Sequence, residues 1–288
     1  MAEVPLYAKI LSYLFIVVYM VSVTMESTQG EIKTMLKDKR RMRLALLANL
    51  VIVPILAFIL VRVLQLRPDI RIGVIMLAIS PGGVFALQFA RISKGDRVFA
   101  VALVIVLLVL AIFTTPLLAH WFFGREGEGG LFLRLVLLFL LLVAVPLILG
   151  RELQKRFSKI APKLGRWLGL ISILIFIITA LMTGRFKTPA IKALGTDGTT
   201  AIIVLTVVCW IVGWVMGGPE IRNRKVLAIS TAMRNFGVCV PIAIHYFPGT
   251  EVMLPILAFS GISIPMNMVF ALVTGRTLRD PAERPVEA

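Results

Sequence analysis

The sequence predicts an all-α integral membrane protein with about nine transmembrane helices. Hydrophobic residues make up 59% of the 288-residue chain, and its mean hydropathy is +0.95. Apolar runs of about twenty residues, the length that a helix needs to cross a bilayer, recur along nearly the whole chain. A β-barrel is disfavoured because barrel strands alternate in hydrophobicity over about ten residues. The expected spans are 6–28, 43–65, 70–93, 97–123, 131–150, 166–186, 199–217, 224–247 and 251–275.

The basic residues of the chain predict its orientation in the membrane. The formal charge of +16 lies mostly in short loops between the spans, where Lys and Arg act as topology signals rather than as a nucleic-acid surface. The first loop and the loops on the same side carry most of the 31 basic residues. The positive-inside rule therefore places the N-terminus outside and the C-terminus in the cytoplasm. Residues 278–288 are expected to form a flexible cytoplasmic tail.

Two of the apolar spans are interrupted near their middles. Pro81-Gly82-Gly83 interrupts the span 70–93, and the segment from Ser230 to Gly237 interrupts the span 224–247. Broken transmembrane helices are tolerated where the freed backbone groups line a cavity enclosed by protein, and paired breaks mark the binding site of repeat-built carriers. The tetrapeptide Leu-Ala-Ile-Ser precedes both breaks, which supports an internal duplication. These features predict an inverted-repeat transporter fold with two broken crossing helices.

Several short motifs occur in an order and spacing that resemble a known family. They are Pro81-Gly82-Gly83, Lys94-Gly95-Asp96, Thr115-Pro116-Leu117-Leu118, and Met233-Arg234-Asn235 with Gly237. On these residues the chain resembles the bile acid:sodium symporter superfamily. The resemblance implies a five-plus-five inverted repeat, and the nine expected spans are similar to the subgroup that lacks the first helix. It also implies a panel domain over 1–42 and 131–190, and a core domain over 43–130 and 191–277.

The sodium-site pattern of that family does not carry over to this chain. Apolar side chains stand where the family has polar ligands, at Val84, Phe85, Ala86, Leu87, Val104 and Leu108. Ser230 replaces the expected glutamate and Arg234 the neighbouring glutamine, while Asn49 is a surviving polar match. Sodium needs several oxygen ligands, and a guanidinium among them would repel it. We therefore expect two-sodium coupling to be lost, with no bound metal and no cofactor.

Arg234 is the central candidate because an arginine within an apolar span should face a cavity or a partner rather than lipid. In one interpretation it is a fixed cation that replaces the coupling ions and binds an anionic substrate. In the other, broken-helix carbonyls or the side chains of Asn235 and Gln88 satisfy it, and it locks the crossover without touching substrate. No Asp or Glu lies near the centre of any expected span, since Glu26 and Glu251 fall close to span ends.

The remaining candidates surround the two breaks. An amphipathic pocket would use aromatic rings for an apolar substrate body and amides for its head group, although ordinary core packing explains each aromatic equally well. The glycines of the first break permit a half-helix N-terminus to face an anion. The expected substrate-binding residues are Arg234, Asn235, Ser230, Gln88, Phe85, Phe236, Asn49 and Asn267, and the expected crossover residues are Pro81, Gly82, Gly83 and Gly237.

The leading functional hypothesis is a secondary transporter for a small or amphipathic organic anion, sodium-independent and working by alternating access in a bacterial inner membrane. Its partners would be the anion and the lipid bilayer, with no nucleic acid. Alternatives are a sodium-coupled symporter with an altered site, a non-transporting membrane receptor, and an auxin-efflux-like carrier. An arsenite-efflux-like protein is disfavoured because neither Cys209 nor Cys239 lies at the Pro-Gly-Gly break. The spans carry no metal cluster, paired carboxylates or Ser/His/Asp constellation, which argues against an enzyme.

Overall fold

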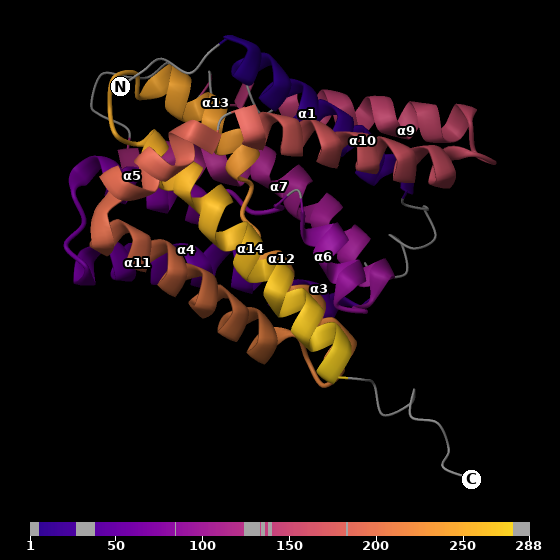
Figure 1. Ribbon diagram of the computed structural model, residues 1–288. Helices are drawn as coiled ribbons and strands as arrows, with labels where there is room; N and C mark the ends of the chain where they lie inside the picture. The colour runs from indigo at the N-terminus through magenta and orange to yellow at the C-terminus, as the bar shows by residue number, and fades with distance from the viewer. Residues whose placement is uncertain are drawn as a thin grey trace.

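The computed structural model describes residues 6–26, 38–83, 85–123, 133, 136–137, 140–182 and 184–278 (Figure 1). Within these ranges the regular elements are all helical, which confirms the predicted all-α class. The helices are α1 (Leu6–Glu26), α3 (Lys39–Leu47), η1 (Ala48–Ile52), α4 (Val53–Val63), α5 (Pro68–Ala78), α6 (Ala86–Ile92), α7 (Arg97–Phe123), η2 (Leu140–Ala144), α9 (Val145–Arg156), α10 (Ala161–Met182), α11 (Gly184–Met216), α12 (Ile221–Ala232), α13 (Phe236–Tyr246) and α14 (Met253–Thr277). The expected tail lies outside the described residues, apart from Leu278.

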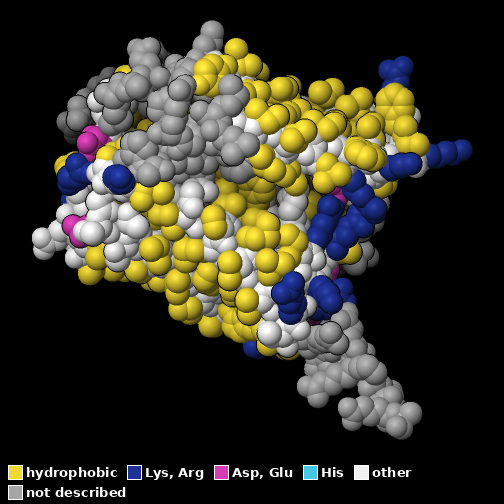
Figure 2. Space-filling view, viewed as in Figure 1, with side chains coloured by type: hydrophobic (Ala, Val, Ile, Leu, Met, Phe, Trp, Pro, Cys, Tyr) yellow, Lys and Arg dark blue, Asp and Glu magenta, His cyan; other side chains and the backbone are white. Residues whose placement is uncertain are grey.

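Five stretches of helix are long and apolar enough to cross a membrane. They are Lys39–Val63, Arg97–Phe123, Ile191–Met216, Ile221–Ile244 and Met253–Thr277. The segment Tyr13–Glu26 is a shorter apolar helix. Figure 2 shows hydrophobic side chains over most of the visible face, as expected for a surface in contact with lipid. The chain is therefore an integral membrane protein, and the count of nine spans stays a prediction.

Helix α1 packs against both α9 and α10, and the three helices form one layer, the upper one in Figure 1. Glycines allow this close approach: a Cβ at Gly150 would lie 2.9 Å from the Val21 carbonyl oxygen, and one at Gly165 would lie 3.0 Å from the Glu26 backbone nitrogen. Small residues at such contacts let membrane helices pack backbone against backbone. The Ser22 hydroxyl adds a hydrogen bond of 2.9 Å to the Gly165 carbonyl. The proposed panel would contain this layer.

In the second layer, α11 packs against α12 and α14. The contact with α12 is close because a Cβ at Gly213 would lie only 2.5 Å from the Ala228 Cα. The element α11 joins two helical segments across a kink at Gly195, where φ is 77°, so the second segment begins near the expected start at residue 199. The positive φ at this glycine allows the change of direction between the two segments.

The two expected breaks are present, and they lie against each other. Helix α5 ends at Ala78 and α6 begins at Ala86, while α12 ends at Ala232 and α13 begins at Phe236. The second break is shorter than the expected Ser230 to Gly237, because the α12 hydrogen bonds continue through Ala232 and Phe236 already opens the next helix.

The broken segments are joined through their backbones. The Gly83 amide donates to the Met233 carbonyl at 2.9 Å, and the Asn235 amide donates to the Ser80 carbonyl at 2.8 Å. Gly82 has a φ of 81°, a conformation that favours glycine. Gly83 has no room for a side chain, since its Cβ would lie 2.2 Å from the Met233 carbonyl oxygen. The turn thus favours glycine at position 82, and the close crossing requires glycine at position 83.

Candidate functional site

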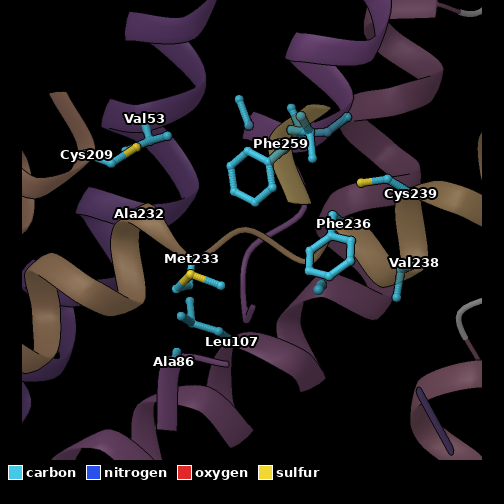
Figure 3. Close-up of a cluster of buried hydrophobic side chains, with 14 of the residues drawn as sticks. Val53, Ala86, Leu107, Cys209, Ala232, Met233, Phe236, Val238, Cys239 and Phe259 are labelled. Atoms are coloured by element: carbon cyan, nitrogen blue, oxygen red, sulfur yellow. The ribbon is translucent and has the colours of Figure 1, made fainter. Parts of the chain in front are cut away.

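Arg234 lies in the extended segment between α12 and α13, at the crossing of the two broken helices. The segment runs through the middle of a buried apolar cluster, where Figure 3 shows Met233, Phe236 and Phe259 on either side of it. The whole Arg234 residue is 0% exposed and is the largest fully buried residue among those described. A charged group in such a place requires polar partners inside the protein.

All five N–H donors of the Arg234 guanidinium have oxygen acceptors. The Nε group donates to the Leu77 carbonyl at 3.3 Å, and Nη1 donates to Asn49 Oδ1 at 3.1 Å and to the Thr231 carbonyl at 3.2 Å. Nη2 donates to the Asn49 carbonyl at 3.2 Å and also to the Ala78 carbonyl. These acceptors come from α5, α12 and the η1 segment. The guanidinium therefore bonds together three separate parts of the fold.

The charge of Arg234 is balanced by carbonyl dipoles. Leu77 and Ala78 end α5, and Thr231 is in the last turn of α12. The C-terminal end of a helix carries a partial negative charge that stabilises a cation. In the described part of the chain, no Asp or Glu forms an ion pair with Arg234, and no group of three or more His, Cys, Asp or Glu is placed to hold a metal. The guanidinium sits in an oxygen cage of the kind that a cation would occupy.

A widened helical turn supplies two of the five oxygens. Asn49 lies in η1, a π-helical segment in which the Val53 amide donates to the Ala48 carbonyl, five residues earlier. In an α-helix the same amide would donate to Asn49, so the π-turn leaves the Asn49 carbonyl free for Arg234. Pro54 follows directly and has no amide hydrogen, so it cannot donate to the Asn49 carbonyl five residues earlier. The Asn49 amide group also donates to the Ala45 carbonyl at 3.0 Å.

Aromatic rings line the crossover on the side of α1. Phe85 stacks with Phe236 at a centroid distance of 6.5 Å and an interplanar angle of 6°, and with Phe15 of α1 at 6.0 Å. Phe236 also contacts Phe259 of α14, with centroids 6.2 Å apart. The expected pair Phe85 and Phe236 is thus brought together, and both rings are buried. They form an apolar surface that connects the crossover to α1.

The other predicted residues fall into two groups. Asn235 caps α13 by accepting from the Val238 amide at 3.4 Å, and Ser230 is buried one turn before the break. Asn267 belongs to a separate cluster, because its side chain accepts from the Trp210 indole at 2.9 Å and donates to the Ser263 carbonyl at 2.8 Å. Gln88 lies farther along α6.

Sequence reasoning missed the backbone part of the site. The carbonyls of Leu77, Ala78 and Thr231 carry no side-chain signal, and only their position just before the breaks indicates that helix ends converge there. It also missed an ion pair between Glu26 and Arg91, which joins α1 to α6. The sequence predicts Glu26 near the end of its span, a position that gives no signal of a buried partner.

Two broken apolar helices that cross at a buried polar centre are characteristic of secondary transporters with discontinuous helices. The sequence profile of the Sodium Bile acid symporter family matches residues 13–194. The chain therefore belongs to the sodium bile acid symporter family, as its motifs predicted.

Curated relatives are similar over most of the chain. The uncharacterized sodium-dependent transporter YocS of Bacillus subtilis is 24% identical over 244 residues, covering 82% of this chain and 73% of the relative. The human hepatic sodium/bile acid cotransporter is 24% identical over 280 residues, covering 92% and 76%. The probable sodium/metabolite cotransporter BASS1 of Arabidopsis thaliana chloroplasts is 22% identical over 236 residues, covering 79% and 57%.

Proposed function

We propose that this protein is a sodium-independent secondary transporter for a small or amphipathic organic anion, in which Arg234 replaces the coupling cations. The observation that carries the proposal is the bonding of all five guanidinium donors to oxygens at the crossing of the broken helices. Family membership supports the transporter class. The inverted repeat, the panel and core division, and the outward N-terminus are parts of the same proposal.

Electrostatics argues against a sodium ion in the same cage. Two unit charges about 4 Å apart repel by about 4 kcal/mol at an effective dielectric constant near 20. A sodium ion would also need oxygens that already accept from Arg234, such as those of Asn49 and Ala78. A tethered guanidinium provides the positive charge permanently, so the crossover is held together without an ion from solution.

The loss of a coupling ion affects the direction in which the anion is transported. An inside-negative potential opposes the entry of an anion by about 2.3 kcal/mol per charge for each 100 mV. Without sodium to drive accumulation, efflux or exchange is the favoured mode for an organic anion. We include this direction in the proposal.

The proposal also includes direct contact between Arg234 and the substrate. The hydrogen bonds of Arg234 determine when that contact can form. Every donor is engaged with protein in the conformation described, and the residue is 0% exposed. An anion can therefore reach the guanidinium only if at least one of these bonds is exchanged during the transport cycle. The bond to Thr231 is a candidate for exchange because it lies within the same broken helix.

The test is the thermal stability of the purified protein with a panel of organic carboxylates, sulfonates and phosphates, in sodium chloride and in choline chloride. A ligand that binds the folded state selectively raises its stability. We expect the same anions to raise the melting temperature equally in both salts. Proteoliposomes should then exchange a radiolabelled form of the best anion without sodium. Stabilisation or exchange that requires sodium would refute sodium independence.

A sodium-coupled symporter with an altered site is the second candidate. One observation favours it: two relatives carry sodium cotransport in their names, and the YocS name calls that protein sodium-dependent. Sodium would then bind through backbone groups away from Arg234. The sodium arm of the same experiment decides between the two candidates.

A further inference from the structure

A second buried charge lies where the two layers meet, away from the crossover cage. Glu26, the last residue of α1, forms an ion pair with Arg91 of α6. The Glu26 side chain is 1% exposed, whereas the Arg91 side chain is 33% exposed. The pair joins the layer of α1, α9 and α10 to one of the broken helices.

The Glu26 carboxylate is enclosed by glycines of α10. A Cβ on Gly165 would lie 2.8 Å from Glu26 Cγ, and one on Gly169 would lie 2.9 Å from Ser22 Oγ and 3.5 Å from Glu26 Oε1. Glycines at these two positions therefore make the space for the carboxylate. Because a buried carboxylate without a partner is costly, Glu26 depends on Arg91 for its charge in this conformation.

The same place has an excess of positive charge. Arg97 and Arg166 are close enough to Arg91 to repel its charge, and Glu26 is the only Asp or Glu that forms an ion pair with Arg91 in the described residues. Figure 2 shows Lys and Arg side chains gathered where the two layers meet, toward the right of the view. Glu26 thus pairs with Arg91, whose charge Arg97 and Arg166 repel, and this excess of positive charge attracts a further anion.

A buried hydrogen-bond donor is also present there. Tyr19 of α1 is 1% exposed, its hydroxyl has no hydrogen-bond partner among the described residues, and it interacts electrostatically with Arg91. Gln88 lies one turn before Arg91 on α6, and its buried Oε1 has no hydrogen-bond partner within the part of the chain that the structure describes. A buried polar atom left without a partner costs free energy, so its presence points to a ligand.

We propose that Arg91 binds the anionic group of the transported substrate, which takes the place of Glu26, and that the Tyr19 hydroxyl donates to the same group. The ligand class is a small organic carboxylate or sulfonate, since a guanidinium fork matches planar oxyanions. The Glu26–Arg91 pair is then a latch between the layers, and substrate opens it by exchanging one anion for another. This inference rests on the proposed function, because it assigns to that transporter an anion-recognition site in addition to Arg234.

The exchange of Glu26 for a substrate anion on Arg91 couples substrate binding to movement of α6. A substrate anion on Arg91 leaves Glu26 without its partner, and the freed carboxylate becomes favourable only when water reaches it. The Glu26 side chain is 1% exposed and lies beside Gly165 and Gly169, so hydration of its carboxylate requires α6 to move away from α1 and α10. A ligand shifts a conformational equilibrium by its differential affinity for the two states, and here that difference arises because the anion and Glu26 compete for one guanidinium.

The experiment uses the full chain with Cys209→Ser and Cys239→Ser, which removes the native thiols, and with Ser22→Cys as a reporter in the latch. Position 22 is buried beside Gly169, so a closed latch should protect its thiol from maleimide. We expect little labelling without ligand and at least about tenfold faster labelling with the best anion of the panel. Glu26→Gln should label fast without ligand and should retain anion binding.

Arg91→Gln should also label fast but should bind the anion at least about tenfold more weakly, whereas Arg91→Lys should retain part of the affinity. The charge exchange Glu26→Arg with Arg91→Glu should restore protection without restoring anion binding. The control is Glu152→Gln, which breaks an exposed ion pair with Lys155 and should change neither readout.

Unchanged anion affinity in Arg91→Gln, or full recovery of affinity in the charge exchange, overturns the proposal while leaving the proposed function intact. A requirement for sodium, together with the Arg91→Gln defect, would instead refute sodium independence and retain the latch. If no anion in the panel stabilises the parent protein, both proposals fail.

Discussion

Arg234 donates two hydrogen bonds to Asn49, one to the side-chain Oδ1 at 3.1 Å and one to the main-chain carbonyl at 3.2 Å. These residues are 185 positions apart in the sequence, and both are 0% exposed. The pair connects the break between α12 and α13 to the π-turn that precedes α4. The first two predictions concern this connection.

Replacing Asn49 with Ala should destabilise the protein without changing its helical content. Nη1 would lose one acceptor, and a buried donor left without a partner costs about 1–3 kcal/mol, more when it is charged. The main-chain bond from Nη2 would remain, so the fold should survive. Thermal unfolding in detergent should therefore show a lower melting temperature. Asn49→Asp is the matched variant: it retains the acceptor and adds a counter-charge, so it should be more stable than Asn49→Ala. Equal stability of the two variants would contradict the cage.

Replacing Arg234 with Gln should make the protein sensitive to sodium. The change removes the tethered charge and leaves several of the five oxygens without a donor, including those of Ala78 and Thr231. Oxygens in that arrangement favour a hard cation. We expect a lower melting temperature in choline chloride and a partial recovery in sodium chloride, whereas the parent protein should behave alike in both. Arg234→Lys should remain insensitive to sodium, because it retains the charge. Sodium-independent stability of Arg234→Gln would refute the replacement of coupling cations by Arg234.

The crossover and the cage differ in how far they follow from sequence. Pro81 and the two glycines after it predict a break, because their effect on the backbone is local. Arg234 was identifiable because a charge in an apolar span is costly wherever the chain folds. The Asn49 carbonyl was not identifiable as an acceptor for Arg234. Its role depends on a π-turn near Pro54 and on helix ends brought together from distant parts of the chain.

The ion pair between Glu26 and Arg91 illustrates the same limit. Each residue stands near the end of an apolar segment, where a charge is ordinarily hydrated, so neither is notable alone. They are 65 positions apart, and their contact depends on how two layers of helices pack. The glycines at 165 and 169 are the only local trace, and their spacing is also common in ordinary helix packing.

Replacing Gly83 with Ala should abolish correct crossing of the broken helices. The added methyl group would lie 2.2 Å from the Met233 carbonyl oxygen and 2.9 Å from that of Arg234, and both atoms belong to the backbone. The segments must separate, which weakens the bond from the Gly83 amide to Met233. We expect low yield of folded protein by size-exclusion chromatography and no anion exchange in proteoliposomes. Gly261→Ala is the control, because its Cβ would meet only Ile191 Cδ1 at 3.5 Å. Normal exchange by Gly83→Ala would contradict the tight crossing.

Replacing Phe85 with Ala should separate two roles of the aromatic surface. The ring stacks on Phe236 and Phe15, and removing a buried Phe ring costs about 3–5 kcal/mol, so the melting temperature should fall whatever the ring does in transport. If the ring also covers an apolar substrate body, an anion with a large apolar body should lose more affinity than a small carboxylate. We expect that difference to be at least about tenfold in ligand-induced stabilisation. Phe113→Ala is the control, since that side chain is 62% exposed on α7. Equal losses for both anions would assign Phe85 to core packing alone.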